Sequence, residues 1–291
     1  MSAWVLGVIG GSGLYEIEGL EGARWVEIEG PFGAPSDAVL TGRLGETELV
    51  FLPRHGRGHR ISPTAINARA NIDALKRAGC TDVISISAVG SLREDRPPGS
   101  FVIVDQFVDR TFARDKSFFG PGLVAHVSMA HPVCERLSAL AEAAAREAGA
   151  PVVRGGTYLA MEGPQFSTGA ESRLYRSWGC DVIGMTGMPE AKLAREAELP
   201  YASVAMVTDF DAWDDDIAHV EVSQILAQLT ANADTARELV RRLALALPAE
   251  RPASPIDTAL EGAIITAPDA RDPAMIERLS AVAGRALGLK S

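Results

Sequence analysis

An apolar run that ends in two carboxylates constrains the fold of this chain more than any other feature. Residues 201–207 have the length and composition of a β-strand, and Asp209 and Asp211 follow them. In extended backbone the two acidic side chains point the same way. Ligands of α/β proteins gather at the carboxyl ends of strands, so this position favours a functional site. Asp also caps helices and forms solvated turns, and residues 214–216 are aspartates as well, so that second interpretation stays open.

A glycine-rich turn follows the first predicted strand, residues 3–9. The turn reads Gly10-Gly11-Ser12-Gly13, but the dinucleotide-binding pattern G-x-G-x-x-G fails, because Glu16 stands where its third glycine belongs. We interpret the turn as a backbone cradle in which amide groups and the Ser12 hydroxyl meet an anion. A plain tight turn is the alternative.

Two further strands end in groups that suit an anion. The strand predicted at residues 48–52 runs into Arg54-His55-Gly56-Arg57, whose guanidinium forks fit phosphate oxygens, although a solvated loop is the alternative. The strand predicted at 82–87 runs into a small-residue loop at 88–92, so that Ser87 and Ala88 flank the strand end. Both segments are candidate anion ligands.

Thr186 marks a fourth candidate anion site. Pro189 fits the first turn of a helix that reaches about residue 198, so Thr186 lies at the N-terminus of that helix. Helix N-termini attract anions, but a threonine there also serves as a simple cap, and both interpretations stay open.

Strand-like and helical patterns alternate along the rest of the chain. Further strands are predicted near residues 25–28, 38–41, 101–105, 151–161 and 181–184, and helices at 63–78, 132–149, 222–243 and, after a proline-rich linker at 248–255, at 273–287. The alternation predicts an α/β fold in which several strand ends build one anion pocket.

Charge and composition narrow the partners. The chain has 291 residues and a formal net charge of -10, so a nucleic acid is an unfavourable partner, whereas a small anion in a basic cleft is not. No apolar run reaches about 20 residues, and no basic segment precedes the first apolar run, so we expect neither a membrane span nor a secretory signal. The cysteines Cys80, Cys134 and Cys180 lack metal-ligand spacing, and their odd number argues against a disulfide scaffold. We therefore expect a cytoplasmic protein.

Taken together, the motifs resemble those of the purine nucleoside phosphorylase family, and most of all its members that act on 5'-methylthioadenosine. The resemblance covers residues 8 to 243 in unbroken order, and the tail after Pro248 matches less clearly. It is carried by Gly10-Gly11-Ser12-Gly13, Pro31-Phe32-Gly33, Arg54-His55-Gly56, Ala88-Val89-Gly90-Ser91-Leu92, Asp105-Gln106-Phe107, Asp109-Arg110-Thr111, Glu162-Gly163-Pro164, Met185-Thr186 and Thr208-Asp209-Phe210-Asp211.

The resemblance implies one α/β domain with a central, mixed and partly barrel-like β-sheet flanked by helices. Residues 1–247 would form this phosphorylase domain, and residues 248–291 a linker and C-terminal helix packed on it. It also implies a homotrimer, and leaves open whether two trimers pair into a hexamer. The implied reaction is phosphorolysis of 5'-methylthioadenosine to adenine and 5-methylthioribose 1-phosphate, with inorganic phosphate as co-substrate and no metal or organic cofactor.

The resemblance also implies a role for each site residue. Asp209 would donate a hydrogen bond to N7 of the leaving base, for which it must keep a proton near neutral pH, and Asp211 would contact the exocyclic amine. Phosphate would be held by Ser12, Arg54, His55, Ser87, Ala88 and Thr186; the purine and ribose by Phe166 and Met185; and the methylthio group by Val222, Ile225 and Leu226, with His126 reaching in from a neighbouring subunit.

The choice of base and the type of reaction leave alternatives. In family members that take 6-oxopurines, asparagine and glutamate generally stand where Asp209 and Ser167 stand here, so this chain favours a 6-aminopurine. Ser12 replaces the threonine of eukaryotic members, and Gly184 and Gly187 flank Met185-Thr186 where bulkier residues are common in the family. The form Met-Thr-Gly-Met-Pro-Glu also occurs in methylthioinosine-cleaving relatives. A broader range that includes methylthioinosine, inosine or adenosine, a hydrolytic nucleosidase, and a non-catalytic nucleoside sensor are therefore the alternatives.

Overall fold

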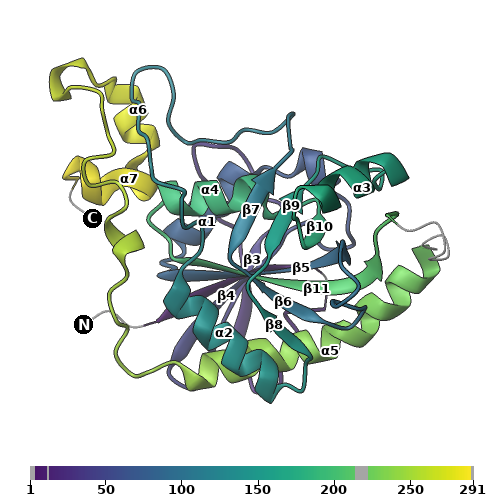
Figure 1. Ribbon diagram of the computed structural model, residues 1–291. Coiled ribbons are helices and arrows are strands. Elements are labelled where there is room, and N and C mark those ends of the chain that lie inside the picture. The colour runs from purple at the N-terminus through teal and green to yellow at the C-terminus, as the bar shows by residue number, and fades with distance from the viewer. Residues whose placement is uncertain (1–3, 12, 214–221, 290–291) are drawn as a thin grey trace.

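A mixed, branched β-sheet lies at the centre of the computed structural model, which describes residues 4–11, 13–213 and 222–289 (Figure 1). The branch is at β5 (Asp82–Ser91). One path of hydrogen-bonded strands runs β2-β3-β4-β1-β5-β10-β9-β7, and a second leaves β5 through β11, β6 and β8. The α/β fold with a mixed, partly closed sheet that the sequence predicts is confirmed.

The branch leaves part of β5 unpaired on one edge. β1 (Val5–Gly10) pairs with β5 only as far as Ser85, and β10 (Val182–Gly184) joins the same side only at Gly90 and Ser91. β11 (Tyr201–Phe210) follows the other edge along its length. Residues 86–89 therefore keep one open edge in the middle of the sheet.

The other elements complete the sheet and cover it. The strands are β2 (Glu21–Val26), β3 (Val39–Leu44), β4 (Thr47–Pro53), β6 (Phe101–Val104), β7 (Gln106–Asp109), β8 (Val152–Arg154) and β9 (Thr157–Ala160); the helices are α1 (Ala68–Arg77), α2 (Glu135–Glu147), α3 (Gly169–Ser177), α4 (Gly187–Glu196), α5 (Val222–Ala246), α6 (Pro273–Arg278) and α7 (Ser280–Leu287). Within the described ranges no helix is long and apolar enough to cross a membrane.

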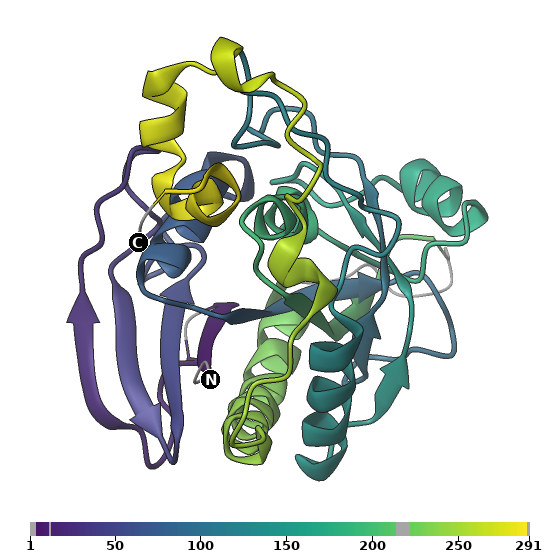
Figure 2. The ribbon, with the colours of Figure 1, turned by 90° about the vertical axis from the view of Figure 1, so that its left-hand side faces the viewer.

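Alternation along the strands builds a hydrophobic core on each face of the sheet. In β11, Tyr201, Ala205 and Val207 pack into the core that α1, α4 and α7 cover. Val204 and Met206 point the other way, into the core under α2 and α5. These two helices run side by side on that face (Figure 2).

Several predicted element bounds are wrong, each for a local reason. The helix expected at 63–78 starts as a short 3₁₀ turn, Pro63–Ala65, and α1 begins only after Asn67, whose side chain accepts a hydrogen bond from the N–H of Ala70. The strand expected at 151–161 breaks at Gly155 and Gly156, which have positive φ angles. The last helix breaks into α6 and α7, and β7 was not predicted.

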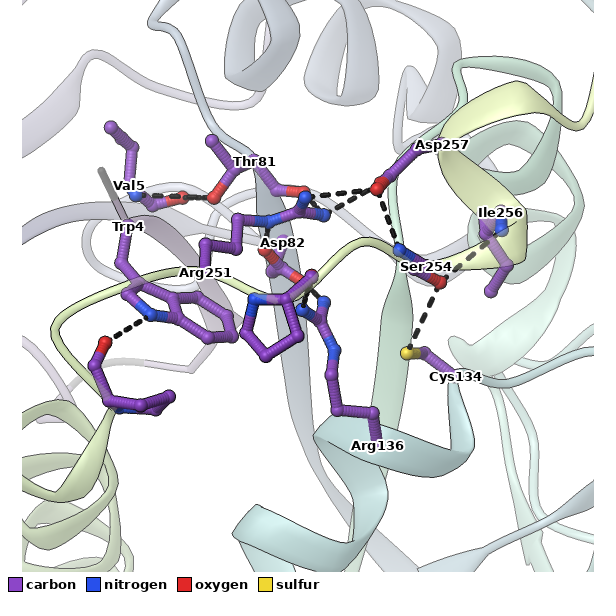
Figure 3. A network of polar contacts seen from close by, with 12 residues as sticks. Trp4, Val5, Thr81, Asp82, Cys134, Arg136, Arg251, Ser254, Ile256 and Asp257 are labelled. Atoms are coloured by element: carbon purple, nitrogen blue, oxygen red, sulfur yellow. Dashed lines mark hydrogen bonds and ion pairs between the residues drawn. The ribbon is translucent and has the colours of Figure 1, made fainter. Parts of the chain in front are cut away.

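The C-terminal segment is fixed to the sheet by a buried polar network (Figure 3). Asp82, at the start of β5, is fully buried and contacts the guanidinium groups of Arg251 and Arg136. Arg251 also donates to Asp257, and Trp4 Nε1 donates to the Pro248 carbonyl at 2.8 Å. The segment then packs α7 on α1 at the face opposite α2 and α5.

Candidate active site

The strand ends that the sequence singles out meet at a cavity of about 290 Å³ beside the branch in the sheet. Arg54, Thr186 and Asp209 all line this cavity, although they come from distant parts of the chain. Gly11 after β1, residues 86–90 of β5, and α5 are among the other contributors to its walls. The cavity thus has basic groups and an acid facing one volume.

Asp209 lies within β11, partly buried in the cavity wall. Burial raises the pKa of its carboxyl group from 3.8 to about 6; a hydrogen bond with the Thr208 hydroxyl opposes the rise, and the charge of Asp211 adds to it. The sequence predicts that this strand ends before the acid, and that prediction is wrong. β11 continues to Phe210 because its pairing with β5 continues that far. Because Asp209 is buried within a strand, the interpretation as a solvated turn is wrong. The helix-cap interpretation is wrong as well, because α5 begins only at Val222.

Asp211 lies just beyond β11 and is 7% exposed. Its N–H donates to the Ser91 carbonyl at 2.9 Å, which holds the residue beside β5. Burial raises the pKa of its carboxyl group, and the hydroxyls of Ser172 and Ser167 beside it reduce the rise. Oδ2 is buried without a hydrogen-bond partner among the described residues, so it is available to a donor group of a ligand.

Ser87 and Ala88 line the cavity from within β5, not from a loop. The loop predicted at 88–92 is wrong because β11 pairs with this strand to its end. The open edge nevertheless exposes backbone: the Ile86 carbonyl points there and accepts from Arg54 at 3.0 Å. Backbone groups alternate sides along a strand, so the N–H of Ala88 faces the same edge.

Arg54 is 2% exposed and held by a carboxylate. Its Nε and Nη2 donate to Glu190 of α4 at 3.0 and 3.2 Å, and Nη2 also donates to the Ser85 hydroxyl at 2.6 Å. Burial alone would lower the pKa of Arg54, but the Glu190 charge outweighs it and the pKa is raised. Nη1 carries two hydrogens, and among the described residues only the Ile86 carbonyl accepts one, which leaves the other for a ligand.

His55 is neutral in this cavity. Burial, together with the charge of Arg54, lowers its pKa to about 4, against a hydrogen bond with the Ile61 carbonyl that raises it. Nδ1 lies 2.8 Å from that carbonyl and therefore carries the ring hydrogen, which leaves Nε2 as an acceptor. His59 stacks on the ring, with 4.2 Å between centroids, and also lines the cavity; the sequence analysis did not select it.

Thr186 stands at the N-cap position of α4 without a side-chain capping bond. The simple-cap interpretation is therefore wrong for its hydroxyl, which lines the cavity instead. Met188 has non-helical backbone angles (φ −124°, ψ 140°), so the regular part of α4 begins only after it. The predicted anion site at the helix N-terminus is therefore wrong in that respect, and what Thr186 offers an anion in the cavity is its hydroxyl.

The predicted nucleoside contacts are only partly in the cavity. Phe166, which is 58% exposed, and Met185 line the cavity. Ser167 is not among the lining residues, but its hydroxyl lies beside the carboxyl group of Asp211, which is. From α5 the cavity is lined by Leu229 and Ala233, which the sequence analysis missed. Among the other predicted contacts, Leu226 is 56% exposed and does not line the cavity, and Ser12 and the side chains of Val222 and Ile225 lie outside the described residues.

His126 lies away from this cavity within one chain. It lines a second depression with Lys116 and Lys192, and its N–H donates to the Ala263 carbonyl of the C-terminal segment at 2.9 Å. The N–H of Ile265 donates back to Val124, so the tail pairs with the loop that carries His126. This side chain therefore faces outward on a loop that the tail fixes.

A buried brace below Met185 and Thr186 was not predicted. Arg114 donates to the carbonyls of Met185 and Met188 at 2.6 and 2.9 Å, and its Nε donates to Glu162 at 3.0 Å. Burial alone would raise the pKa of Glu162, but hydrogen bonds from Thr64, the backbone and Arg114 lower it to about 2. The pairing of Arg114 with Glu162 spans 48 positions, so no local pattern in the sequence reveals it.

Comparison with known proteins agrees with this geometry. A sequence model of the Phosphorylase superfamily matches residues 5–246. An S-methyl-5'-thioadenosine phosphorylase from Cereibacter sphaeroides is 62% identical, over 97% of this chain and 98% of the relative. A solved methylthioadenosine phosphorylase from an antarctic soil metagenomic library superposes with a TM-score of 0.91 at 44% identity, over 97% of this chain and 99% of the other. The Schistosoma mansoni methylthioadenosine phosphorylase in complex with adenine has a TM-score of 0.78 at 38% identity, with 85% and 93% covered.

Proposed function

This chain belongs to the phosphorylase superfamily, and we propose that the cavity at the branch of its sheet is the active site. The protein is a pentosyltransferase that cleaves 5'-methylthioadenosine with phosphate to adenine and 5-methylthioribose 1-phosphate. The observation that carries the assignment of the site is one cavity lined by Arg54, Thr186 and Asp209, the last with a pKa raised to about 6.

Phosphate binds at the open edge of β5. The free Nη1 hydrogen of Arg54, the N–H of Ala88 and the hydroxyls of Ser87 and Thr186 donate to its oxygens, and Ser12 belongs to the same set. His55 is neutral and has an acceptor at Nε2, so it accepts a hydrogen bond from the hydroxyl of a singly protonated phosphate. Charged and neutral donors together hold a dianion where water is largely excluded.

Cleavage uses phosphate at C1' of the sugar and a proton donor at the leaving base. The glycosidic bond breaks through an oxocarbenium-like state, which the adjacent phosphate stabilises before it attacks C1'. Asp209 gives its proton to N7 of adenine as the base leaves, a step worth about 10²–10⁴-fold in rate. Asp211 accepts from the 6-amino group through its unpartnered Oδ2, and Phe166 packs on the purine.

No metal or organic cofactor takes part in this scheme. The proton comes from Asp209 and the nucleophile is phosphate itself, so every step has a group to perform it. We expect enzyme dialysed against EDTA to keep full activity in metal-free phosphate buffer. A loss of activity that added divalent cation restores would contradict the scheme.

The assembly proposed for the enzyme is a homotrimer, with pairing into a hexamer as the alternative. His126 faces outward in one chain, as a residue must if it serves a neighbouring cavity, where it and the side chains of Val222, Ile225 and Leu226 surround the methylthio group. We also propose a cytoplasmic enzyme, since Cys80, Cys134 and Cys180 are all free and buried.

A substrate panel with phosphate present tests the proposed function. We expect kcat/KM for 5'-methylthioadenosine to exceed that for adenosine, methylthioinosine and inosine, because Asp209 and Asp211 match a 6-aminopurine and the α5 wall (Leu229, Ala233) is apolar. A higher value for inosine or methylthioinosine would contradict the assignment of the base site.

A further inference from the structure

The hydroxyl of Thr208 lies directly beside the acid and has no role in the scheme above. Thr208 is the extra residue of a bulge in β11: Val207 pairs with Val89 of β5 and Asp209 pairs with Gly90, so Thr208 itself has no partner. Its side chain is 5% exposed and lines the cavity. The bulge thus places a buried hydroxyl next to Asp209 that the sheet does not need.

Two acceptors share the one hydrogen of this hydroxyl. Oγ1 of Thr208 lies 2.7 Å from Oδ1 of Asp209 and 3.2 Å from the carbonyl oxygen of Val89. A hydroxyl has a single hydrogen, so it donates in one direction at a time. When it donates to Oδ1, the proton of a neutral Asp209 is favoured on Oδ2, because the unprotonated oxygen of a carboxyl group is the stronger acceptor. When it donates to Val89, Oδ1 is free to carry that proton and to donate it back to Oγ1.

The other oxygen of the carboxyl group lies against β5. A Cβ atom at Gly90 would come within 3.2 Å of Oδ2 of Asp209, closer than most such contacts. Glycine at this position therefore leaves room for the carboxyl group, and Thr208 and Gly90 together fix how it is turned.

We propose that Thr208 is a positioning residue for proton donation, whose hydroxyl keeps the proton of Asp209 on Oδ2 and stabilises the carboxylate that remains after transfer. In that step the Oδ2–H bond breaks, the N7–H bond forms, and the electron pair of the broken bond becomes the charge of Asp209. The hydrogen bond from Thr208 to Oδ1 then has a charged acceptor, which makes it about twice as strong as a neutral one. This inference rests on the proposed function, because it concerns the same acid and the same leaving base.

The surroundings of Asp209 make the inference testable through pH. The other titratable or charged side chains that line the cavity, within the described residues, are Arg54, His55, His59 and Asp211. β5, β10 and α5 contribute only uncharged side chains to the cavity walls around Asp209. Replacement of Thr208 leaves all of these groups in place, so a change in the pH profile reports on Asp209.

The test compares Thr208→Val and Thr208→Ser by kcat/KM for 5'-methylthioadenosine from pH 5 to 9, at saturating phosphate. The hydrogen bond from Thr208 opposes the rise in the pKa of Asp209, so its removal moves the alkaline limb of the profile upward. We expect a shift of about one pH unit in Thr208→Val and a loss of about tenfold in the maximum of kcat/KM. Thr208→Ser keeps the hydroxyl and restores both to within about threefold.

Thr47 provides the matched control. It is 4% exposed, and its hydroxyl also donates to a backbone carbonyl, that of Ala244 at 2.8 Å, but this hydroxyl bonds to no carboxyl group among the described residues and Thr47 does not line the cavity. Thr47→Val therefore removes a comparable buried hydrogen bond without touching the proton donor. We expect it to lower stability and to leave the pH profile in place.

Two outcomes would overturn the inference. One is a Thr208→Val enzyme whose kcat/KM falls by the same factor at every pH, with its alkaline limb at the wild-type position, as expected for Thr47→Val. That result would show that Thr208 has only a structural role. The other is a full tenfold loss from Thr208→Val in an Asp209→Asn background, where we expect less than about twofold because the acid is gone. If wild-type enzyme releases no adenine with phosphate present, the proposed function itself fails, which is a separate result.

Discussion

At the scale of single residues, the account depends on a carboxyl group that keeps its proton close to neutral pH. Asp209 was a candidate from the sequence because it follows an apolar run. Arg54, Thr186 and Asp211 were candidates because they hold comparable positions. The partners that set their properties were not predictable. Glu190 lies 136 positions from the arginine it holds, and no local pattern records such a contact.

Replacement of the proposed acid should change both rate and base preference. We expect Asp209→Asn to lower kcat/KM for 5'-methylthioadenosine by about 10²–10⁴-fold, because an amide cannot transfer a proton to N7. The amide can donate to a 6-oxopurine, so inosine-type substrates should gain relative to adenine-type ones. Steady-state kinetics with both nucleosides give the ratio. An unchanged ratio would contradict the role of Asp209 in reading the base.

The same variant should be more stable than the wild type at alkaline pH. The pKa of Asp209 is raised from 3.8 to about 6 in the folded protein, so its favourable contribution is complete below pH 3.8 and is lost as pH rises through 6. Asparagine stays neutral throughout. We therefore expect thermal unfolding to show a gap in favour of Asp209→Asn that grows on the order of 2 kcal/mol from pH 4 to pH 8. A gap independent of pH would contradict the raised pKa.

At the scale of elements, the sequence predicts the order of strands and helices better than their limits. Strand β5 was expected to stop before Ala88, but neighbouring β11 extends it, and pairing across the sheet is not visible in a single run of residues. The break at Gly155 and Gly156 has a local signal, two adjacent glycines, which the sequence analysis did not use. The branch in the sheet, which creates the open edge of β5, depends on long-range pairing throughout.

The brace under the segment between β10 and α4 should matter for phosphate binding. Glu162→Gln removes the charge that holds Arg114, whose guanidinium group fixes the carbonyls of Met185 and Met188 on either side of Thr186. We expect a higher KM for phosphate and a loss of about 3 kcal/mol in the free energy of unfolding at pH 7.5, because a buried arginine loses its carboxylate.

Acid pH should erase most of that difference in stability. The pKa of Glu162 is lowered from 4.5 to about 2, so its contribution is present above pH 4.5 and is lost as pH falls toward 2. Urea unfolding at pH 7.5 and pH 3 should therefore show the two proteins converging. Glu142→Gln on the surface of α2, where Arg146 is the partner, serves as the control and should change stability by less than about 1 kcal/mol at either pH. Equal differences at both pH values would contradict this role of Glu162.

At the scale of the whole molecule, the C-terminal segment is anchored to the rest of the fold by the polar network around Asp82 and Arg251 (Figure 3). Leu260, Leu279 and Val282 enter the core under α1, and the tail pairs with the loop that carries His126. We propose that residues 248–291 fold as one unit with residues 1–247. The sequence marked the proline-rich linker but gave no sign of its anchor, because Asp82 and Arg251 lie 169 positions apart.

Loss of the anchor should destabilise the entire chain. Arg251→Met leaves Asp82 fully buried with Arg136 as its one ionic partner among the described residues, so we expect a loss of about 3–5 kcal/mol in the free energy of unfolding. Arg242→Met on α5, which breaks partly exposed pairs with Glu147 and Glu238, should cost less than about 1 kcal/mol. Urea denaturation of both variants at one protein concentration makes the comparison, and similar losses would contradict an anchoring role.

The dependence of base release on phosphate tests the central claim most directly. Adenine release from 5'-methylthioadenosine is followed with and without inorganic phosphate, and the sugar product is identified by phosphorus NMR. We predict adenine and one equivalent of 5-methylthioribose 1-phosphate with phosphate, and almost no release without it. Equal rates of adenine release in both conditions, with free methylthioribose as the product, would show that water is the nucleophile and that the cavity beside β5 does not hold a reacting phosphate.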